Sequence, residues 1–295
     1  MNFFEAIILG LIQGITEFLP ISSSGHLVIA EQLLHIKMDT GVLFEVMLHM
    51  GTLAAICITF RSDLKRMFWE MIHIFSDLYF NLKVFLHNKI HEMEEKQYKK
   101  ILHNNYRKLV VMILISTVPT GIVGYFLKGI VEQLSTSMLA AGLGLLVTAI
   151  LLLVVDYWDP GDKIPKDMTS SQAVIVGICQ GIGVIPGISR SGITITSGLL
   201  CGFRKSFAVK YSFLISIPAI LGAMILELKE FTVPSMNWQT GATYISGMLV
   251  AGVAGYFCIR FMLSFIQKRR FKVFAFYCML MGIGAIVCNF VLAQP

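Results

Sequence analysis

Charged residues are scarce in this chain of 295 residues: they make up 14% of the total, whereas 56% of the residues are hydrophobic. The mean hydropathy is correspondingly high, at +0.73. Soluble domains carry about 25% charged residues, so this composition excludes a water-soluble fold. The composition is typical of a protein that crosses the membrane several times.

The sequence also lacks a Cys-x-x-Cys pair, because its six cysteines are scattered through apolar runs. This distribution argues against a disulfide framework and against a zinc site. The first ten residues have no basic segment and no small-residue cleavage site, so we expect no removable signal peptide. The net charge of +6 arises from basic residues gathered in two loops, 61–108 and 264–272. Such loops are the positive-inside signal of membrane topology, so no nucleic-acid partner is expected.

An internal repeat organises the chain. The segment 13–26, QGITEFLPISSSGH, returns at 180–193 as QGIGVIPGISRSGI. In both copies an apolar run too short to cross a bilayer is interrupted by proline, glycine and hydroxyl residues, and then resumes. Broken apolar segments at corresponding points of two halves indicate a binding site near the membrane midplane.

Six further apolar runs have about the 20 residues that a membrane-spanning helix needs: 42–60, 109–127, 138–156, 207–228, 241–262 and 272–292. Three runs in each half is an odd number, so the second half is inverted relative to the first. The two broken segments must then enter and leave the membrane on one side. The sequence therefore predicts an all-α polytopic membrane protein with an inverted-topology repeat, six spanning helices and two re-entrant helix hairpins that meet near the midplane.

The predicted division places the first membrane repeat at 1–156 and the second, inverted repeat at 157–295. Residues 61–108 form a cytoplasmic or interfacial insertion in the first repeat. The first part of this insertion has apolar residues at helical spacing among charged ones, which predicts an amphipathic helix on the membrane surface. A regulatory or partner-binding element is the alternative.

Ionisable and hydroxyl side chains gather in the two broken segments. An ionisable side chain at membrane depth costs about 2.5–3.5 kcal/mol on insertion scales, so such groups need an explanation. The purely structural explanation is that Glu17 pairs with Arg190 and locks the two hairpins together. The candidate site residues are Gln13, Glu17, Ser22, Ser23, Ser24 and His26 in the first segment, and Ser189, Arg190, Ser191 and Thr194 in the second.

These groups together predict phosphoryl transfer or phosphate hydrolysis. A guanidinium is a planar, two-pronged donor for phosphate oxygens, and a serine-rich turn that leads into a helix forms an anion site. Ser23 is a candidate nucleophile, and His26 is its candidate general base or orienting group. Glu17 would hold a divalent cation or tune His26.

A second polar pair follows the first hairpin. Glu45 and His49 lie four residues apart in the run 42–60, so they share one helix face. Either they support the site from outside or they form a buried structural hydrogen bond.

The two motifs resemble those of the undecaprenyl-pyrophosphate phosphatase family, which is also linked to bacitracin resistance. The resemblance rests on residues 13–26, on PGISRSGIT at 186–194 and on FEVMLHMGTLAA at 44–55. It extends over the chain apart from 61–108. It implies an enzyme of the bacterial cell membrane that hydrolyses undecaprenyl pyrophosphate to the monophosphate carrier lipid for cell-wall synthesis, with a fold of two re-entrant helix pairs in an inverted repeat.

The resemblance also implies roles for individual residues. Ser22, Ser23 and His26 match the family's catalytic turn, and the candidate residues from Ser189 to Thr194 match its phosphate-binding turn. The implied cofactor is a divalent cation, Mg²⁺ or Ca²⁺. The first glutamate of the family's motif is Gln13 here, so the cation would depend mainly on Glu17. The attacking group is left open between Ser23, His26 and a water molecule, with Ser23 favoured and His26 as its base.

Two alternatives use the same residues. A lipid-phosphate transporter or flippase has the same inverted-repeat architecture and would only bind the anion. A lipid phosphatase of the phosphatidic-acid-phosphatase type would need His and Asp shortly after its Ser-Arg element, and the segment 189–200 has neither. The expected partners of the chain are a prenyl pyrophosphate lipid and membrane lipids. Small-residue faces such as Gly10-x-x-x-Gly14 also allow a homodimer.

Overall fold

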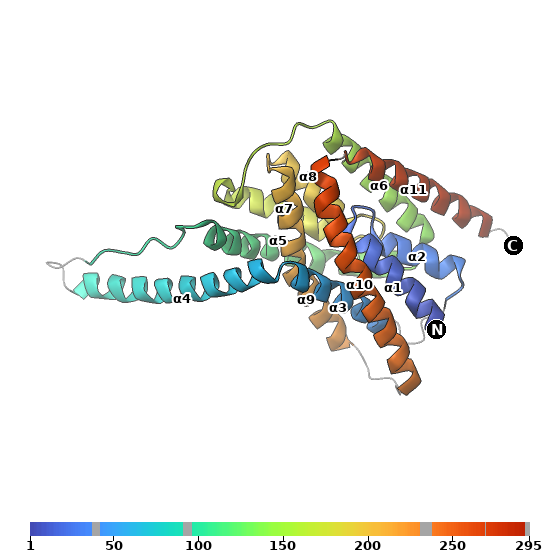
Figure 1. Cartoon of the computed structure of the whole chain (residues 1–295), viewed down its shortest axis with the longest axis horizontal. Helices are drawn as coiled ribbons and strands as arrows, with labels where there is room; N and C mark the ends of the chain where they lie inside the picture. Colours follow the sequence, from blue (N-terminus) through green and yellow to red (C-terminus); the bar gives the residue numbers. More distant parts are fainter. Residues whose placement is uncertain (37–41, 91–95, 231–237, 269, 293–295) are drawn as a thin grey trace.

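The computed structural model describes residues 1–36, 42–90, 96–230, 238–268 and 270–292. Within these ranges the regular structure is helical, with one isolated β-bridge between Lys163 and Phe203. The prediction of an all-α protein is therefore confirmed. Figure 1 shows the helices gathered into a bundle from which one long helix projects.

The helices differ in length in a way that matters for function. Four are short: α1 (Phe3–Phe18), α2 (Ser23–Leu33), α7 (Ser170–Ile182) and α8 (Arg190–Leu200). The longer ones are α3 (Val42–Thr59), α4 (Arg61–Ile90), α5 (Asn105–Leu134), α6 (Met138–Asp156), α9 (Lys205–Glu230), α10 (Trp238–Lys268) and α11 (Lys272–Leu292), and a 3₁₀ turn, η1 (Pro165–Asp167), precedes α7.

Five helices of the described part, α5, α6, α9, α10 and α11, are long and apolar enough to cross a membrane. A sixth span is formed if α3 is counted with α4, although the two are bent by 83° at their junction. These helices contain the six predicted apolar runs, because apolar length is a local property of the sequence. The chain is thus a multi-pass membrane protein.

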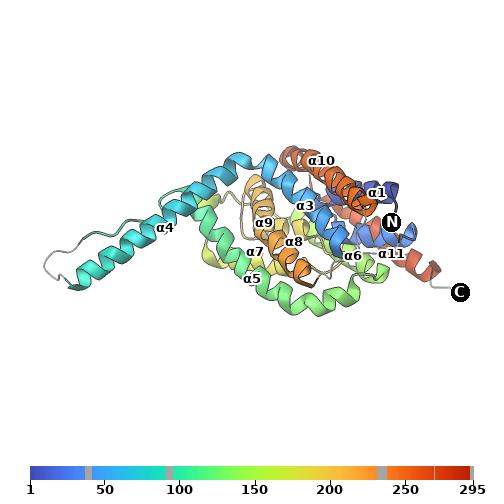
Figure 2. The same ribbon diagram turned by 90° about the horizontal axis from the view of Figure 1, so that it is seen from below.

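Helices from the two halves of the chain pack against each other. α1 and α3 lie on α10, α6 lies on α11, and α5 lies on α7; Figure 2 shows α1 and α3 beside α10. Glycine makes the close approach possible: a Cβ atom on Gly10 would lie 2.4 Å from the carbonyl oxygen of Gly247, and one on Gly177 would lie 2.2 Å from that of Ser116. The small-residue motifs therefore pack within the chain.

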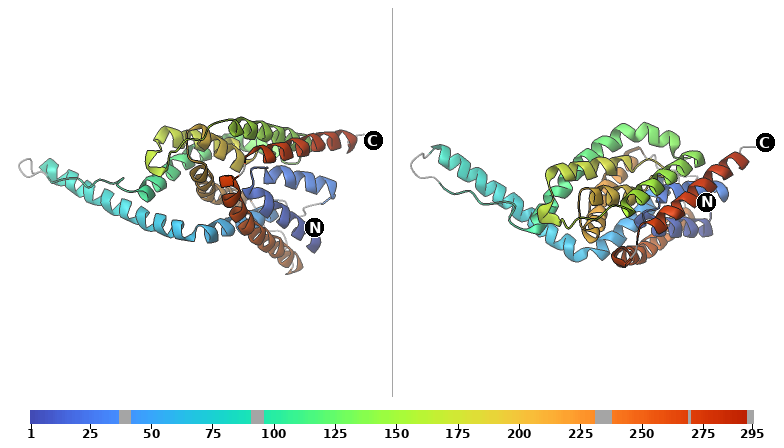
Figure 3. Two further views of the ribbon diagram at one scale, coloured as in Figure 1. Left: turned by 45° about the horizontal axis from the view of Figure 1, so that its top comes forward. Right: turned by 90° about the horizontal axis from the view of Figure 1, so that it is seen from above.

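α4 leaves the bundle at its junction with α3, and Figure 3 shows it extending well beyond the other helices. Residues 96–104 run back beside it without helical structure. The Asn81 side chain donates to the carbonyl of Lys99 and the Asn88 side chain to that of Lys96, both at 2.9 Å. The predicted helix in the first part of the insertion is present, and residues 91–95 of the insertion lie outside the described residues.

Candidate active site

The two serine-rich turns cap their helices with the same kind of hydrogen bond, although the backbone of Ser22 has a φ of 69° and that of Ser189 a φ of −74°. Ser22 is the N-cap of α2, and its Oγ accepts a hydrogen bond from the amide of Gly25 at 3.2 Å. Ser189 is the N-cap of α8, and its Oγ accepts from the amide of Gly192 at 3.0 Å. Serine is favoured at this position because its short side chain satisfies an amide that has no partner within the helix. The repeat seen in the sequence is thus matched by equivalent N-cap hydrogen bonds.

The next serine in each turn extends the match. The hydroxyls of Ser22 and Ser24 lie 3.3 Å apart, and those of Ser189 and Ser191 lie 3.2 Å apart. The amides of the first two residues of each helix have no acceptor within that helix. Each turn therefore combines hydroxyl groups with backbone donors at the positive end of a helix dipole, which is the composition of an anion site.

Glu17, near the end of α1, connects the two turns. Arg190 Nη2 donates a short hydrogen bond to Glu17 Oε1 in an ion pair, and the Ser23 hydroxyl donates to Glu17 Oε2 at 2.6 Å. Gln13 Nε2 donates to the same Oε2 at 3.1 Å. The Glu17 side chain is 2% exposed and that of Arg190 is 21% exposed. The ion pair of the structural explanation is present, but it occupies one carboxylate oxygen and leaves the other to Ser23 and Gln13.

His26 lies behind the first turn rather than beside Ser23. Its Nδ1 donates to the carbonyl of Ser22 at 2.7 Å, which leaves Nε2 to accept from the hydroxyl of Tyr277 at 2.8 Å. Among the described contacts, Ser23 therefore donates to Glu17 and not to His26, its candidate base or orienting group. Spacing along the helix placed His26 within one turn of Ser23, but the two side chains point to different neighbours.

The Ser22 backbone is unusual for a residue with a side chain, with φ at 69°. A non-glycine residue in this region is strained, and such strain persists only where the surroundings hold it. The His26 ring binds the Ser22 carbonyl directly. His26 therefore stabilises the conformation of the turn that carries Ser23.

The turns also touch each other. Ser191 Oγ donates to the carbonyl of Leu19 at 3.0 Å. A Cβ on Gly25 would lie 3.0 Å from Cα of Gly187, whose φ of 83° favours glycine. Residues 172 positions apart in sequence are thereby held together, with Glu17 and Arg190 at the junction of the two turns.

A cavity of about 270 Å³ opens onto this junction. Its polar lining includes Gln13, Glu17, all three serines of the first turn, Glu45, His49, Gln180, Ser189, Arg190 and Ser191. Apolar side chains form another part of the wall, among them Leu27, Val131, Val184, Ile220 and Met224. The cavity suits a ligand with an anionic end and an apolar end.

Thr194 occupies a different position from the other predicted phosphate-binding residues. It is 2% exposed, and its hydroxyl bonds to the carbonyl of Arg190 at 2.8 Å and to the hydroxyl of Ser212 at 2.6 Å. It does not belong to the cavity lining among the described residues. Its contacts hold the first turn of α8, and with it Arg190, against α9.

Two amide oxygens at the cavity have no hydrogen-bond partner among the described residues: the buried Oε1 atoms of Gln13 and Gln180. The amide orientations follow from their other contacts, because Gln13 Nε2 faces a carboxylate and Gln180 Nε2 faces the carbonyl of Ile215. A buried amide oxygen without a partner, on a residue that also contacts a carboxylate, has the chemistry of a ligand for a hard cation such as Mg²⁺. No three His, Cys, Asp or Glu side chains gather as a metal site in the described part of the chain, so substrate oxygens would have to complete the coordination.

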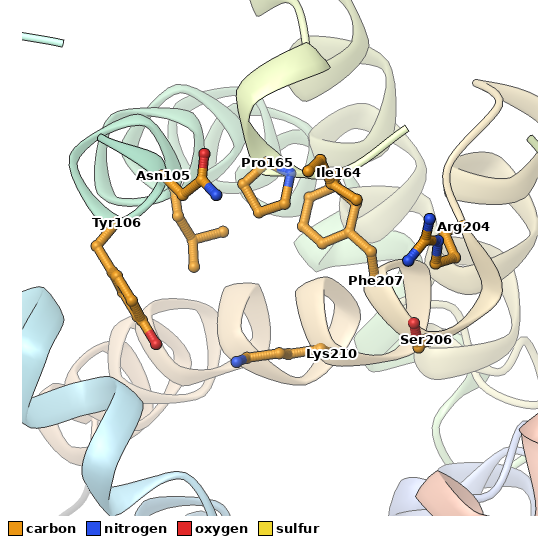
Figure 4. Close-up of a pocket in the computed structure, with 9 residues that line it drawn as sticks. Asn105, Tyr106, Ile164, Pro165, Arg204, Ser206, Phe207 and Lys210 are labelled. Carbon is orange, nitrogen blue, oxygen red and sulfur yellow. The ribbon is translucent and has the colours of Figure 1, made fainter. Parts of the chain in front are cut away.

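A second cavity, of about 300 Å³, lies where α5, η1 and α9 meet. Figure 4 shows Tyr106, Pro165, Phe207 and Lys210 around it. Lys210 Nζ lies 2.7 Å from Asp63 Oδ1, which also accepts from the Tyr106 hydroxyl at 2.8 Å. Its lysine is thus already paired with Asp63, and this cavity shares no lining residue with the cavity at the serine turns.

Tyr277 and Thr148 are the site residues that sequence reasoning missed. Tyr277 on α11 binds His26, and Thr148 on α6 accepts the Ser189 amide at 2.9 Å. Both lie in apolar runs outside the repeated motif. A lone hydroxyl residue in a membrane helix is usually an ordinary interhelical hydrogen-bonder, so the sequence contained no signal for either role.

Comparison with known proteins gives a consistent result. The family model described as bacitracin resistance protein BacA matches residues 6–284. A protein of Alkaliphilus metalliredigens named undecaprenyl-diphosphatase is 39% identical over 98% of this chain and 99% of its own length. Proteins of the same name from Methanosphaera stadtmanae and Korarchaeum cryptofilum are 39% and 37% identical, over 99% and 97% of this chain and 100% and 99% of their own lengths. The expectation that 61–108 falls outside the resemblance is wrong, because these matches leave no room for such a gap.

Proposed function

The chain belongs to the family of the bacitracin resistance protein BacA, and we propose that it is an undecaprenyl-diphosphatase. It hydrolyses undecaprenyl pyrophosphate to undecaprenyl phosphate and inorganic phosphate, and so recycles the carrier lipid. The observation that carries this proposal is the hydrogen bond from Ser23 to Glu17 beside Arg190, at the meeting point of two helix N-termini. A site that only bound an anion would need Arg190 and the backbone donors, but not a serine held by a carboxylate.

The cavity supports a lipid-linked substrate. Its polar end presents Arg190 and the serine turns, which suit a diphosphate. Its apolar wall, with Leu27, Ile220 and Met224, suits the isoprenoid chain next to the diphosphate. A soluble nucleotide would place a polar sugar against that apolar wall.

In the proposed first step, the Ser23 oxygen attacks the terminal phosphorus. A bond forms between Ser23 Oγ and phosphorus, the bond between phosphorus and the bridging oxygen breaks, and undecaprenyl phosphate leaves. Glu17 accepts the Ser23 proton, since its Oε2 already receives that hydrogen bond at 2.6 Å. The guanidinium N–H groups of Arg190 that do not bind Glu17 are donors for the phosphate oxygens on which charge develops.

In the second step, water attacks the phosphorylated Ser23. Once the proton taken from Ser23 has passed to the departing phosphate, Glu17 accepts a proton from the attacking water and returns it to Ser23 Oγ as the bond between phosphorus and Oγ breaks, which releases inorganic phosphate and restores the serine. His26 keeps the turn in its strained conformation throughout. We thus assign the base role to Glu17, and to His26 the positioning role that the sequence left as its alternative.

We also propose that a divalent cation binds at this site. Glu17 and the Oε1 atom of Gln13 would hold it together with diphosphate oxygens. When bound, it would neutralise charge on the diphosphate and its leaving group.

We also propose that α1–α2 and α7–α8 are re-entrant hairpins of two inverted repeats. At 16, 11, 13 and 11 residues these helices fall short of the roughly 20 needed to span a bilayer. The matched N-cap bonds of Ser22 and Ser189 support their equivalence. Irregular backbone at membrane depth has to be enclosed by protein, and both turns lie at the junction described above.

A homodimer, if it forms, would use a surface other than the small-residue motifs. Gly10 and Gly177 are in close contact with α10 and α5 of the same chain. Those two faces are therefore already occupied.

The test is phosphate release from a prenyl pyrophosphate by the purified full-length protein, with and without EDTA. We expect cation-dependent turnover in the wild type and losses of at least about a hundredfold in Ser23→Ala and Glu17→Gln, the usual scale for removing a catalytic group. Ser197→Ala is the matched control, since Ser197 is buried in α8 and bonds the carbonyl of Thr194 rather than lining the cavity. Its turnover should stay near that of the wild type.

Two results would contradict the proposal in different ways. Near-normal turnover in Ser23→Ala would show that the chain is an enzyme but that Ser23 is not its nucleophile. A water molecule would then take that role. Binding of the lipid without phosphate release under any cation would favour the flippase.

A further inference from the structure

The projecting helix α4 has one face that nothing in the described part of the chain covers. Its exposed apolar side chains recur every three or four residues and so share one side of the helix. We call this face the apolar stripe; it contains Phe68, Phe75, Leu78, Leu82, Phe85 and Ile90, which are between 46% and 73% exposed. A helix of 30 residues is about 45 Å long. The apolar stripe is therefore a continuous exposed surface and not a single scattered apolar residue.

The opposite face of α4 is bound by the chain itself. Arg107, at the start of α5, donates to Glu70 at 2.8 Å and to Asp77 at 2.6 Å. The extended segment 96–104 is fixed to the same side through Asn81 and Asn88. The polar face is therefore occupied, and the orientation of the helix about its own axis is set.

The charges on α4 are divided in the same way. Its three carboxylates, Asp63, Glu70 and Asp77, are each paired with a basic residue from outside the helix. By their positions on the helix, Lys65 and Lys83 flank the apolar stripe. The face that remains free thus offers apolar side chains bordered by lysines, which complements an anionic lipid surface.

The direction of α4 agrees with such a surface. It follows α3, one of the predicted spanning segments, and leaves it at a bend of 83°. α4 therefore turns nearly into the plane of the membrane. Figure 1 shows that it runs outward from the bundle. The loop that contains it holds many basic residues and is on the cytoplasmic side by the positive-inside rule, where the leaflet carries anionic lipids.

We propose that α4 lies on the cytoplasmic surface of the bilayer, with its apolar stripe in the boundary between headgroups and acyl chains and its flanking lysines on anionic headgroups. The segment 96–104 and Arg107 then face water and hold the helix at the correct rotation. This position of α4 on the membrane does not depend on the chemistry of the active site.

Tryptophan fluorescence of the full chain in nanodiscs tests the proposal. The three tryptophans are replaced (Trp69→Phe, Trp158→Phe and Trp238→Phe), and one new tryptophan is introduced as Phe75→Trp, in the centre of the stripe. The matched control is His73→Trp, two residues earlier on α4, where the native side chain is 58% exposed and lies near Glu70 on the polar face. Phosphatase turnover, which should be unchanged in both, shows that each variant is folded.

With phospholipids brominated near the headgroup, we expect strong quenching and a blue-shifted emission for Phe75→Trp, and weak quenching for His73→Trp. Iodide in the buffer should quench in the reverse order. The shift for Phe75→Trp should be larger in nanodiscs that contain anionic lipid than in wholly zwitterionic ones. Quenching of Phe75→Trp by iodide would place the stripe in water, and protection from both quenchers would show that a protein surface or a second copy covers it; either result overturns the proposal.

Discussion

The hydroxyl of Tyr277 lies 2.8 Å from Nε2 of His26, and the two rings are parallel to within 2°. The contact joins α11 to the first turn of α2. Because His26 in turn binds the carbonyl of the strained residue Ser22, a tyrosine 251 positions away from His26 acts on the geometry of the proposed nucleophile's turn.

Replacement of Tyr277 by phenylalanine tests this positioning role. The loss of one neutral hydrogen bond corresponds to about 0.5–1.5 kcal/mol, so kcat should fall by about twofold to tenfold. KM should stay nearly constant, since Tyr277 is outside the cavity lining. Steady-state kinetics of Tyr277→Phe would check both values. The control is Tyr256→Phe, because the Tyr256 ring packs under Arg260 on α10. A rise in KM at constant kcat would show instead that Tyr277 touches the substrate.

The ion pair between Glu17 and Arg190 should contribute to the stability of the folded protein. Removal of one partner leaves a buried charge without compensation, which costs about 3–5 kcal/mol. Arg190→Ala should therefore lower the thermal stability in detergent because the Glu17 side chain is 2% exposed. The double variant Arg190→Ala with Glu17→Gln should regain most of the loss while staying inactive. If the double variant is no more stable than the single one, the destabilisation does not come from the Glu17 charge.

Gln13→Glu tests the proposed cation. The substitution places a second carboxylate beside Glu17, where Gln13 Nε2 now donates at 3.1 Å. Added negative charge strengthens a hard-cation site, so half-maximal activity should need about tenfold less Mg²⁺, a gain of about 1.4 kcal/mol. The same variant should be less stable than the wild type in EDTA, since two like charges then face each other. An unchanged Mg²⁺ requirement would place the cation away from Gln13.

The contacts between α4 and Arg107 should weaken at low pH. Hydrogen bonds from Arg107 hold the pKa of Glu70 and that of Asp77 below their usual values. Carboxyl groups with lowered pKa values stabilise the folded contact above the unfolded pKa of about 4. That contribution is lost as the pH falls through the depressed values.

Hydrogen exchange of the amides in 96–104 reports on this release. It should become faster below about pH 4, after correction for the intrinsic rate. In Glu70→Gln these amides should exchange faster already at neutral pH. The control is Glu132→Gln, because Glu132 lies on α5 with a side chain that is 61% exposed. Exchange that does not change with pH would show that Asn81 and Asn88 are sufficient to hold the segment.

Much of the molecule could be predicted from local sequence. The spanning helices follow from apolar runs, and the two N-caps follow from serine before a helix, because both depend on residues close together in the chain. The pairing of Glu17 with Arg190 was accessible as well, since the repeat placed both in corresponding segments and a charge at membrane depth needs a partner. The proposed division of the chain at 156 stays a prediction of the same kind.

The sequence by itself determined that this chain is a helical membrane protein with two matched serine turns and the side chains of an anion site. Only the tertiary structure decided which contacts those side chains make. Helical spacing put His26 near Ser23, but a histidine has several rotamers, and the neighbour that fixes its ring is Tyr277 on a distant helix. The partner of Ser23 was likewise decided by the approach of α1 to α2, which brings Glu17 within 2.6 Å of it. Contacts between segments far apart in the chain depend on how whole helices pack, and no pattern in a single sequence records that packing.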